Sequence, residues 1–408
     1  MKVLNVAKED FGGAGLATLL IHKELNSKGF ESSLLVKKKT VNDNSIIEWG
    51  ESGIVDRLYS LYIGLIKRIA KNFLNDQFLF FSLFEKKRNN NIDKLRELSK
   101  KYDVILIHWI AGFFSLEEIS SALRGNERCK VYIVPMDMAH LTGGCHFGQS
   151  CKEFKQSCHT CPATNNTYIS KKIRKVNSDK ARSIFELNVE SLSFCDFINE
   201  RCVESSQPIY KYHKFRLPID YNRFNISPKH EGFTIFVGSY NPEDERKGND
   251  HFILCLFELI ALMRKSSEST NISLLYPKGT KLSLPNISNV KIKFYEYAKS
   301  DEEMAKIYNM ANVFVNNSMD DFGPVTLLQS LFCGVPVVSH DLGYASSFIK
   351  NGLNGYLVDN NDYKAFAESL YRIYKGELNS DAESIRNAAI CNHLNSDSIC
   401  DVLLNARV

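Results

Sequence analysis

Residues 319–343, "MDDFGPVTLLQSLFCGVPVVSHDLG", contain the pattern from which the fold of this chain can be worked out. An acidic pair and a Phe-Gly-Pro turn precede an apolar helix pattern, which Gly334 brings to an end. The run VPVVSH that follows is typical of a buried strand. A turn, a helix and a buried strand in such close succession predict one wall of a binding site in a parallel α/β sheet.

The same alternation of strands and helices extends in both directions. Near the start, a strand at 2–7, a glycine turn, a helix at 16–29 and a strand at 32–39 form a strand–helix–strand unit. Further buried strands are expected after these, and residues 196–206 are expected to continue the series. A second alternating series starts near residue 232. The predicted fold class is therefore α/β, with two Rossmann-like, doubly wound domains that face a central cleft.

Chain length and the position of a proline indicate how many domains there are and where they divide. The chain has 408 residues, too many for one hydrophobic core. Pro218 interrupts regular structure in the stretch 215–224, which we interpret as the crossover. The predicted parts are an N-terminal domain at 1–218 with a Cys-rich insertion near 142–165, a C-terminal domain at 219–385, and a helix in 386–408 that packs back across the boundary.

Composition narrows the class of protein. Hydrophobic residues make up 44% and charged residues 24%, the balance of a soluble globular protein. A net charge of +4 gives no general signal for nucleic acid. No signal peptide is visible, and the apolar run near VILIHWIAGFF is shorter than the roughly 20 residues that span a bilayer. We expect a cytoplasmic protein, with the inner leaflet of the cytoplasmic membrane as a candidate peripheral surface.

Four motifs together carry a family resemblance. FGGAG at 11–15, LPID at 217–220, ERKG at 245–248 and the stretch 319–343 follow one another in an order that resembles the retaining GT-B glycosyltransferases of family 4. The segment 136–163 is similar to the branch that builds bacterial capsule, O-antigen and exopolysaccharide. The resemblance covers essentially the whole chain. It implies metal-independent, retaining hexosyl transfer from a UDP- or GDP-sugar to a lipid-linked or oligosaccharide acceptor, without a catalytic cofactor.

The resemblance assigns roles to the charged residues of the second half. Arg246 and Lys247 would neutralise the donor diphosphate, and Lys247 is the better match to the family. The family pattern Glu-x7-Glu is Asp-x7-Gln here, so Asp321 would contact the transferred sugar and Gln329 the ribose. Asp321, Lys247 and Arg246 are the expected catalytic residues. The expected donor-binding residues are Gly13, Gly15, Gly238, Phe322, Gly323, Pro324, Val325, Thr326 and Gln329.

Each of these motifs also has a purely structural interpretation. Residues 11–15 can be a plain turn, residues 244–248 a solvated charge cluster, and residues 319–343 an ordinary helix–strand unit. Ser239 stands where some relatives carry an additional Arg, and Met136 stands where this branch often has His. His108, Asp137 and His140 are candidate sugar contacts in the first half, and a buried, hydrogen-bonded histidine is the alternative for His108.

Cysteines cluster in the predicted insertion. The chain has 11 cysteines, and Cys145, Cys151, Cys158 and Cys161 fall within a short segment that ends in Cys-x2-Cys. Such a set can surround a tetrahedral, structural Zn²⁺, with His146 and His159 as replacement ligands. Disulfides and free thiols are the alternatives.

Residues 54–88 are rich in aromatic and basic side chains, and 170–176 add further cations. An amphipathic basic helix there would bind an anionic membrane, whereas a core-packed helix with a basic exposed face is the alternative. Two other functions fit the same architecture. One is a nucleotide-sugar 2-epimerase, and the other is a degenerate, non-catalytic glycan-binding subunit, which Gln329, Ser239 and Met136 keep open.

Overall fold

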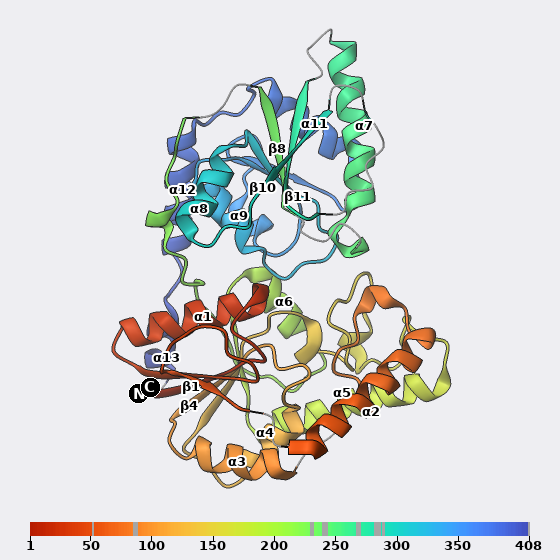
Figure 1. Ribbon diagram of the computed structural model, residues 1–408, viewed down its shortest axis with the longest axis vertical. Coiled ribbons are helices and arrows are strands. Elements are labelled where there is room, and N and C mark those ends of the chain that lie inside the picture. The colour runs from red at the N-terminus through yellow and green to blue at the C-terminus, as the bar shows by residue number, and fades with distance from the viewer. Residues whose placement is uncertain are drawn as a thin grey trace. The chain divides into compact units, whose positions relative to one another are not determined.

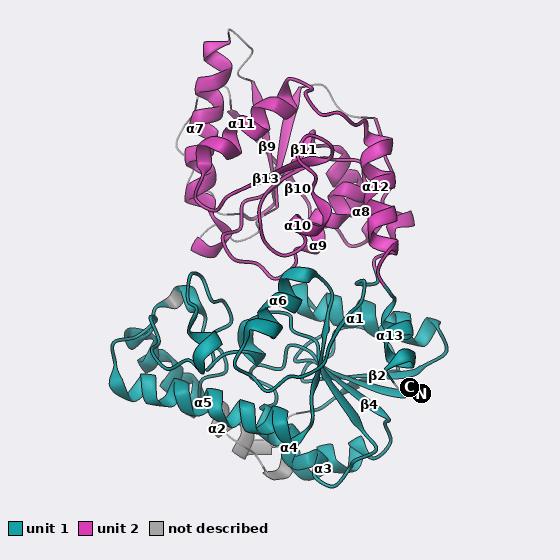
Figure 2. Ribbon diagram, turned by 180° about the vertical axis from the view of Figure 1, so that it is seen from behind, with its two compact units in different colours: residues 1–218, 397–408 teal, residues 219–396 magenta. Residues whose placement is uncertain are grey.

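The computed structural model describes residues 1–50, 53–84, 89–228, 232–238, 244–266, 271–280, 287 and 290–406. The chain divides into two compact units, coloured separately in Figure 2. Unit 1 contains residues 1–218 and 397–408, and unit 2 contains residues 219–396. The chain therefore passes from one unit to the other twice, at residues 218–219 and 396–397.

Unit 1 is built on a seven-stranded parallel sheet with the order β3-β2-β1-β4-β5-β6-β7. Helices flank this sheet, and α13 packs beside α1 near the chain termini (Figure 1). The strands are β1 (Lys2–Val6), β2 (Glu31–Val36), β3 (Ile46–Glu48), β4 (Val104–Ile107), β5 (Lys130–Ile133), β6 (Glu190–Ser193) and β7 (Tyr212–Lys214). The helices are α1 (Gly12–Ser27), α2 (Gly53–Ala70), α3 (Asn89–Ser99), α4 (Leu116–Leu123), α5 (Thr167–Glu186), α6 (Asp196–Glu204) and α13 (Ile399–Asn405).

Unit 2 has a six-stranded parallel sheet with the order β10-β9-β8-β11-β12-β13. Its central strands β8 and β11 are buried along their whole length, as expected for strands covered on both faces. The strands are β8 (Phe233–Val237), β9 (Ile272–Pro277), β10 (Val290–Tyr295), β11 (Val313–Asn316), β12 (Val337–His340) and β13 (Gly355–Val358). The helices are α7 (Asn249–Lys265), α8 (Asp301–Asn309), α9 (Val325–Phe332), α10 (Ala345–Phe348), α11 (Tyr363–Tyr374) and α12 (Ala382–Leu394).

The two sheets confirm the predicted fold class of two doubly wound, Rossmann-like domains. In each sheet the strand order reverses next to the first strand, between β1 and β4 in unit 1 and between β8 and β11 in unit 2. In open α/β sheets, ligands bind outside the carboxyl ends of the strands at such a reversal. The loops after these four strands are therefore the places to look for function.

Two expected elements differ from what the structure contains. Residues 196–206, expected to continue the strand series, form α6 instead, because Ile198 and Cys202 are buried four residues apart, at helical spacing. The segment 386–408, expected as one helix, contains the end of α12 and all of α13. Ser398 and Asp401 form a capping box that starts α13 as a separate helix.

Candidate functional site

The loop after β8 presents two cations at a short 3₁₀ turn, η6 (Glu245–Lys247). Asp244 caps this turn by accepting a 3.1 Å hydrogen bond from the backbone N–H of Arg246. The Asp244 carboxylate also accepts from Arg246 Nη2 at 3.0 Å. Gly248 then ends the turn in the left-handed conformation, with φ of +64°, and α7 begins at the next residue. Asp244 therefore fixes the direction of the Arg246 side chain.

The loop after β11 also contacts these two cations, through Asp320 and Asp321. Lys247 Nζ lies 2.8 Å from Asp321 Oδ2, and Arg246 Nη1 donates to the carbonyl of Asp320 at 2.9 Å. The backbones are joined as well, because Asn317 Nδ2 donates to the Lys247 carbonyl at 2.7 Å. The side chains of Arg246, Asp321 and Lys247 retain 11%, 18% and 28% exposure, so they are reachable from solvent. The structure thus brings together the three residues predicted to be catalytic.

The ionisation of Asp321 follows from these neighbours. Burial by itself would raise the pKa of this carboxyl group. The charges of Lys247 and Arg246, with hydrogen bonding from Lys247 and the Gly323 backbone, outweigh burial, and the net pKa is lowered. Asp321 is therefore ionised at neutral pH and forms an ion pair with Lys247. The two cations face Asp244 and Asp321, so the side chains alone do not make a strongly positive site. Any anion bound here also needs donors from the backbone.

Backbone donors are available at the start of α9. Pro324 occupies the N-cap position, and no side chain caps the helix. The first N–H groups of a helix have no partners within it and carry the positive end of the helix dipole. Gly343 supports this turn, since a Cβ at that glycine would lie 2.9 Å from the Gly323 nitrogen. Four of the residues predicted to bind the sugar donor lie at this helix start, just after Asp321. They are Gly323 and Pro324 in the turn and Val325 and Thr326 in the first turn of α9.

Gln329 lies one turn further along α9 and is partly exposed. Its Oε1 accepts a 3.1 Å hydrogen bond from the hydroxyl of Tyr308, which is fully buried. With Oε1 held by Tyr308, the Gln329 side chain turns its NH₂ group away from that partner. Gln329 can therefore offer its NH₂ group as a hydrogen-bond donor, which the carboxylate of the family pattern cannot do.

The predicted glycines are explained partly by packing. A Cβ at Gly15 would meet the Glu9 carbonyl at 2.7 Å, so this glycine lets α1 pack against the loop after β1. A Cβ at Gly238 would meet the Phe314 ring at 2.6 Å. Gly13 has open space around it. Phe322 is buried, and Ser239 lies outside the described residues.

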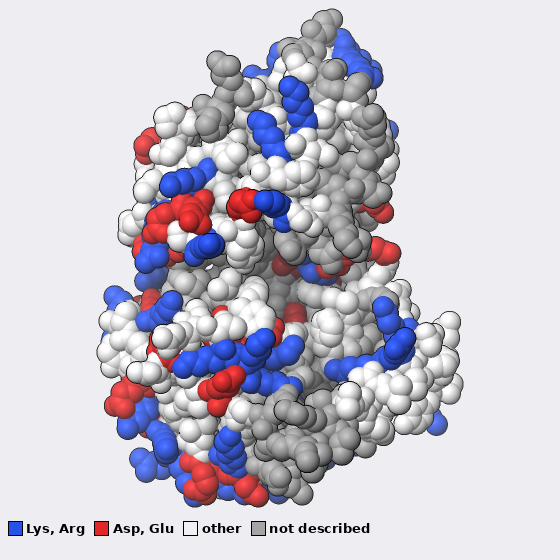
Figure 3. All heavy atoms as spheres, viewed as in Figure 1, with Lys and Arg blue, Asp and Glu red and all other residues white. Residues whose placement is uncertain are grey.

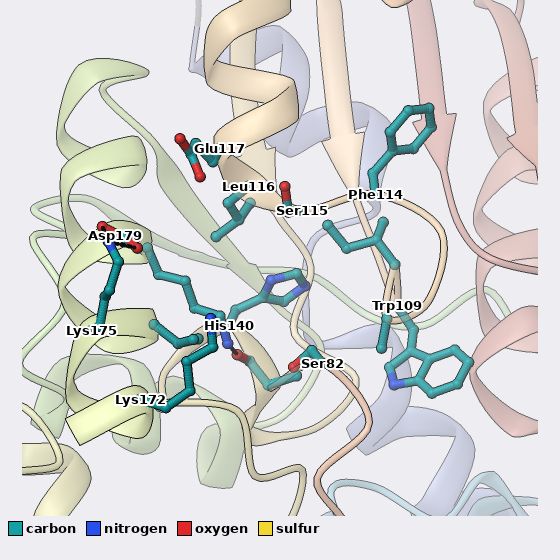
Figure 4. A pocket seen from close by; sticks show the side chains of 15 residues that line it. Ser82, Trp109, Phe114, Ser115, Leu116, Glu117, His140, Lys172, Lys175 and Asp179 are labelled. Carbon is teal, nitrogen blue, oxygen red and sulfur yellow. Dashed lines mark hydrogen bonds and ion pairs between the residues drawn. The ribbon is translucent and has the colours of Figure 1, made fainter. Parts of the chain in front are cut away.

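Unit 1 contains a cavity of about 390 Å³ between α5 and the segments that follow β4 and β5. Figure 4 shows lysines and Asp179 of α5 on one wall, Trp109 and Phe114 on another, and His140 between them. Lys175 is paired with Asp179 at 2.9 Å. The volume lies in the range of small-molecule sites, and an aromatic ring among hydroxyls and carboxylates suits a polar ligand with an apolar face, such as a sugar. The remaining lining residues include Ser82, Ser115, Leu116, Glu117, Lys172 and Lys180.

The three candidate sugar contacts of unit 1 have different surroundings. His140 lines the cavity and bonds the His108 carbonyl at 2.7 Å through Nε2. His108 is fully buried, with Nε2 3.0 Å from Asn5 Oδ1, and burial lowers its pKa to about 3. Asp137 is buried beside His146, with 2.6 Å between Oδ2 and Nδ1. Of the three, the structure places His140 in contact with a cavity.

The four clustered cysteines lie together in unit 1, where all four line one small cavity. All eleven cysteines of the chain are free thiols. Across the described ranges, no group of three or more His, Cys, Asp or Glu side chains is already arranged as a metal site. His146 faces Asp137, and His159 is exposed.

Sequence reasoning missed Asp244, Asn317 and Tyr308, which position Arg246, the Lys247 backbone and Gln329. Asp244 could have been found as an N-cap residue two positions before Arg246. Asn317 and Tyr308 gave no signal, because their partners are distant in the sequence. Trp109 was also missed as a cavity residue, although its position just after a buried strand was a usable signal.

Comparisons with known proteins agree with this architecture. The family model described as "Glycosyl transferases group 1" matches residues 283–390, which include Asp321 and all of α9. One curated relative is the UDP-N-acetylglucosamine–peptide N-acetylglucosaminyltransferase GtfA subunit of Streptococcus pneumoniae serotype 4, 27% identical over 97 residues. That match covers 22% of this chain and 19% of the relative, so the chain matches only a small part of it.

Solved structures are similar over nearly the whole chain at low identity. Anabaena HepE in complex with UDP has a TM-score of 0.62 at 13% identity and covers 100% of this chain and 99% of its own. Sucrose-phosphate synthase from Thermosynechococcus elongatus has a TM-score of 0.58 at 12% identity, covering 96% and 94%. Pneumococcal O-GlcNAc transferase GtfA, in complex with UDP and GlcNAc, has a TM-score of 0.56 at 11% identity, covering 97% and 96%. These likenesses show a GT-B fold, and the family model supports a glycosyltransferase.

Proposed function

We propose that this protein transfers a hexose from a nucleotide sugar to a glycan acceptor with retention of anomeric configuration, in the synthesis of a surface polysaccharide. The observation that carries the proposal is the junction of the loops after β8 and β11, where Lys247 and Arg246 meet Asp321 beside the uncapped start of α9. Two cations and a helix N-terminus suit a diphosphate, and a carboxylate suits sugar hydroxyls. The UDP complexes of HepE and GtfA support a nucleotide-sugar donor.

The chemistry requires stabilisation of a leaving group more than a strong nucleophile. As the bond between the sugar C1 and the phosphate oxygen breaks, negative charge develops on the diphosphate, and Lys247, Arg246 and the α9 amides would stabilise that charge. The acceptor hydroxyl forms the new bond to C1 from the face that the phosphate leaves, and its proton passes to the departing phosphate oxygen. Asp321 would accept hydrogen bonds from the sugar and keep Lys247 in place.

We further propose that unit 1 binds the acceptor in the cavity lined by Trp109 and His140. The cavity offers an aromatic surface, hydroxyls of Ser82 and Ser115, and the carboxylates of Glu117 and Asp179. The aromatic ring can stack on the apolar face of a sugar, and the hydroxyl and carboxylate groups can form hydrogen bonds with the sugar hydroxyls. This cavity and the junction around Lys247 lie in different units, so acceptor and donor binding can be tested separately.

The direct test is a panel of UDP- and GDP-sugars, first by thermal shift and then by product analysis without acceptor. Because a ligand that binds the folded state raises its apparent stability, the true donor should raise the midpoint of unfolding further with each tenfold increase in its concentration above Kd. Slow release of free sugar and nucleoside diphosphate from the same donor would support the transferase. Conversion of the donor to its 2-epimer would contradict it, and binding without any reaction, even with acceptors, would indicate a non-catalytic subunit.

A lipid-linked acceptor would place the protein at a membrane surface, and α2 offers a suitable face. Leu61, Leu65 and Ile69 repeat every four residues along one side of this helix and are between 54% and 72% exposed. Lys67 and Arg68 lie in its last turn. None of the described helices is long and apolar enough to cross a membrane. We propose that this face binds the surface of an anionic bilayer. Elsewhere on the face drawn in Figure 3, Lys and Arg are interspersed with Asp and Glu.

Flotation with vesicles containing anionic lipid tests this proposal. The double variant Leu65→Glu/Ile69→Glu should reduce the vesicle-bound fraction about tenfold or more at low salt, because two exposed apolar contacts are replaced by like-charged repulsion. Leu404→Glu is the matched control, since Leu404 is also 54% exposed but lies on α13. Equal loss in both variants, or no flotation of the unmodified protein, would contradict membrane binding through α2.

A further inference from the structure

The segment between η3 (Met138–His140) and α5 is held together with little regular structure. From residue 141 to residue 166 it contains only the short 3₁₀ turn η4 (Glu153–Gln156). A stretch of this length without helices or strands is uncommon in a compact domain unless another interaction holds it. Its two halves, carrying Cys145 with Cys151 and Cys158 with Cys161, meet at one cavity. The cavity volume is about 20 Å³, enough for one small atom or ion.

A backbone hydrogen bond joins the two halves of the segment at this cavity. Cys158 Sγ accepts from the N–H of Gly143 at 3.3 Å, so the second pair of cysteines is tied to the chain just before the first.

The backbone at the second pair of cysteines is strained. Ser157 and Cys158 both have positive φ, at 62° and 53°. Non-glycine residues are uncommon in this region, and two in succession persist only when their surroundings fix them. The turn buries Cys158, which makes it one wall of the cavity. A ligand for the sulfur atoms would explain why this conformation is kept.

Among the described residues, no group of three or more His, Cys, Asp or Glu side chains is already arranged as a metal site. The four sulfur atoms that line the cavity would therefore have to move closer together around a bound ion. Lys180 lies near Cys158 and donates to the carbonyls of Ala139 and Thr142, so it can offset part of the charge of four thiolates.

We propose that Cys145, Cys151, Cys158 and Cys161 bind one structural Zn²⁺ as a tetrathiolate site that fixes residues 141–166. Structural zinc sites are tetrahedral, four cysteine sulfurs are one of their usual ligand sets, and the cavity has room for a single ion. The ion would sit on the segment that leads into α5, which supplies one wall of the unit 1 cavity. Zinc binding at this site can be measured without any transferase activity.

Elemental analysis of the full-length protein, purified without chelator, tests the proposal. The unmodified protein should contain about one zinc per chain, and Cys158→Ser/Cys161→Ser should contain less than about a tenth of that amount. Cys391→Ser is the matched control and should keep its zinc, because Cys391 is an exposed cysteine outside the cluster. Reconstitution with Co²⁺ should give the visible absorption of a tetrahedral thiolate complex in the control but not in the double variant.

Two outcomes would overturn the proposal. One is the absence of bound metal, before and after incubation with Zn²⁺, together with four thiols in this segment that react freely with a thiol reagent. The other is iron with acid-labile sulfide in place of zinc. If the double variant does not fold, Cys151→Ser alone, or removal of metal from the unmodified protein by a strong chelator, gives the same comparison. Loss of zinc should then lower the midpoint of thermal unfolding. If the four cysteines bind no zinc, the chelator should leave that midpoint unchanged.

Discussion

Replacing Lys247 with alanine should lower donor turnover by about two orders of magnitude, the usual cost of removing one group that stabilises developing charge. The physical reason is the position of Nζ, 2.8 Å from Asp321 and close to the start of α9, where the departing diphosphate would lie. An ammonium has three donors, so Lys247 can keep its bond to Asp321 and still bind a phosphate oxygen. The measurement is the initial rate of donor consumption at saturating donor.

Two controls separate this effect from general damage. Lys364→Ala removes an exposed lysine of α11 in the same unit and should leave the rate within about twofold. Lys247→Arg keeps the charge and should recover part of the lost rate. A midpoint of unfolding close to that of the unmodified protein would show that Lys247→Ala is folded. A folded Lys247→Ala variant with near-normal turnover would contradict the role of Lys247.

Gly248→Ala should destabilise unit 2 by at least about 3 kcal/mol and abolish most activity, because two costs act at one position. The residue has φ of +64°, which disfavours any side chain, and a Cβ would lie 2.0 Å from the carbonyl oxygen of Asn317. That carbonyl belongs to the loop after β11, so the two loops would be forced apart and Lys247 moved from Asp321. Denaturant unfolding together with donor turnover measures both consequences.

Gly376→Ala is the matched control for the backbone cost alone. Gly376 has a similar φ of +72°, but a Cβ there meets nothing within 4 Å. Its substitution should cost only about 1 kcal/mol and leave turnover unchanged. Equal effects of the two substitutions would show that the close approach of the loops after β8 and β11 is unimportant.

The fold could be predicted because the strands and helices of a helix-covered parallel sheet have distinct patterns of apolar residues. Strands such as residues 313–316 are continuous apolar runs, and the helices between them have a period near 3.6. The prediction for 196–206 was wrong because the segment is short. Over so few residues, two buried positions such as Ile198 and Cys202 do not separate a strand pattern from a helix pattern. Tertiary packing of that segment decided in favour of α6.

The site could be predicted only where order along the chain carried the information. Lys247 and Asp321 are 74 positions apart, and their expected proximity came from the family resemblance rather than from spacing. The restraint of Arg246 by Asp244, and of Gln329 by Tyr308, depends on side-chain directions that no local pattern fixes. The unit 1 cavity could not be predicted from local patterns either, because its walls come from segments that are distant in the sequence. Trp109 belongs to one of these segments, His140 to another, and α5 is a third.

The most direct test of the account is a crystal structure of the protein with its nucleotide-sugar donor or the corresponding nucleoside diphosphate. We predict that the diphosphate lies within hydrogen-bonding distance of Lys247 Nζ and of the backbone N–H of Gly323, Val325 or Thr326. A well-ordered diphosphate bound elsewhere, for example beside Lys172 in the cavity of unit 1, with the Lys247–Asp321 pair unchanged, would contradict it.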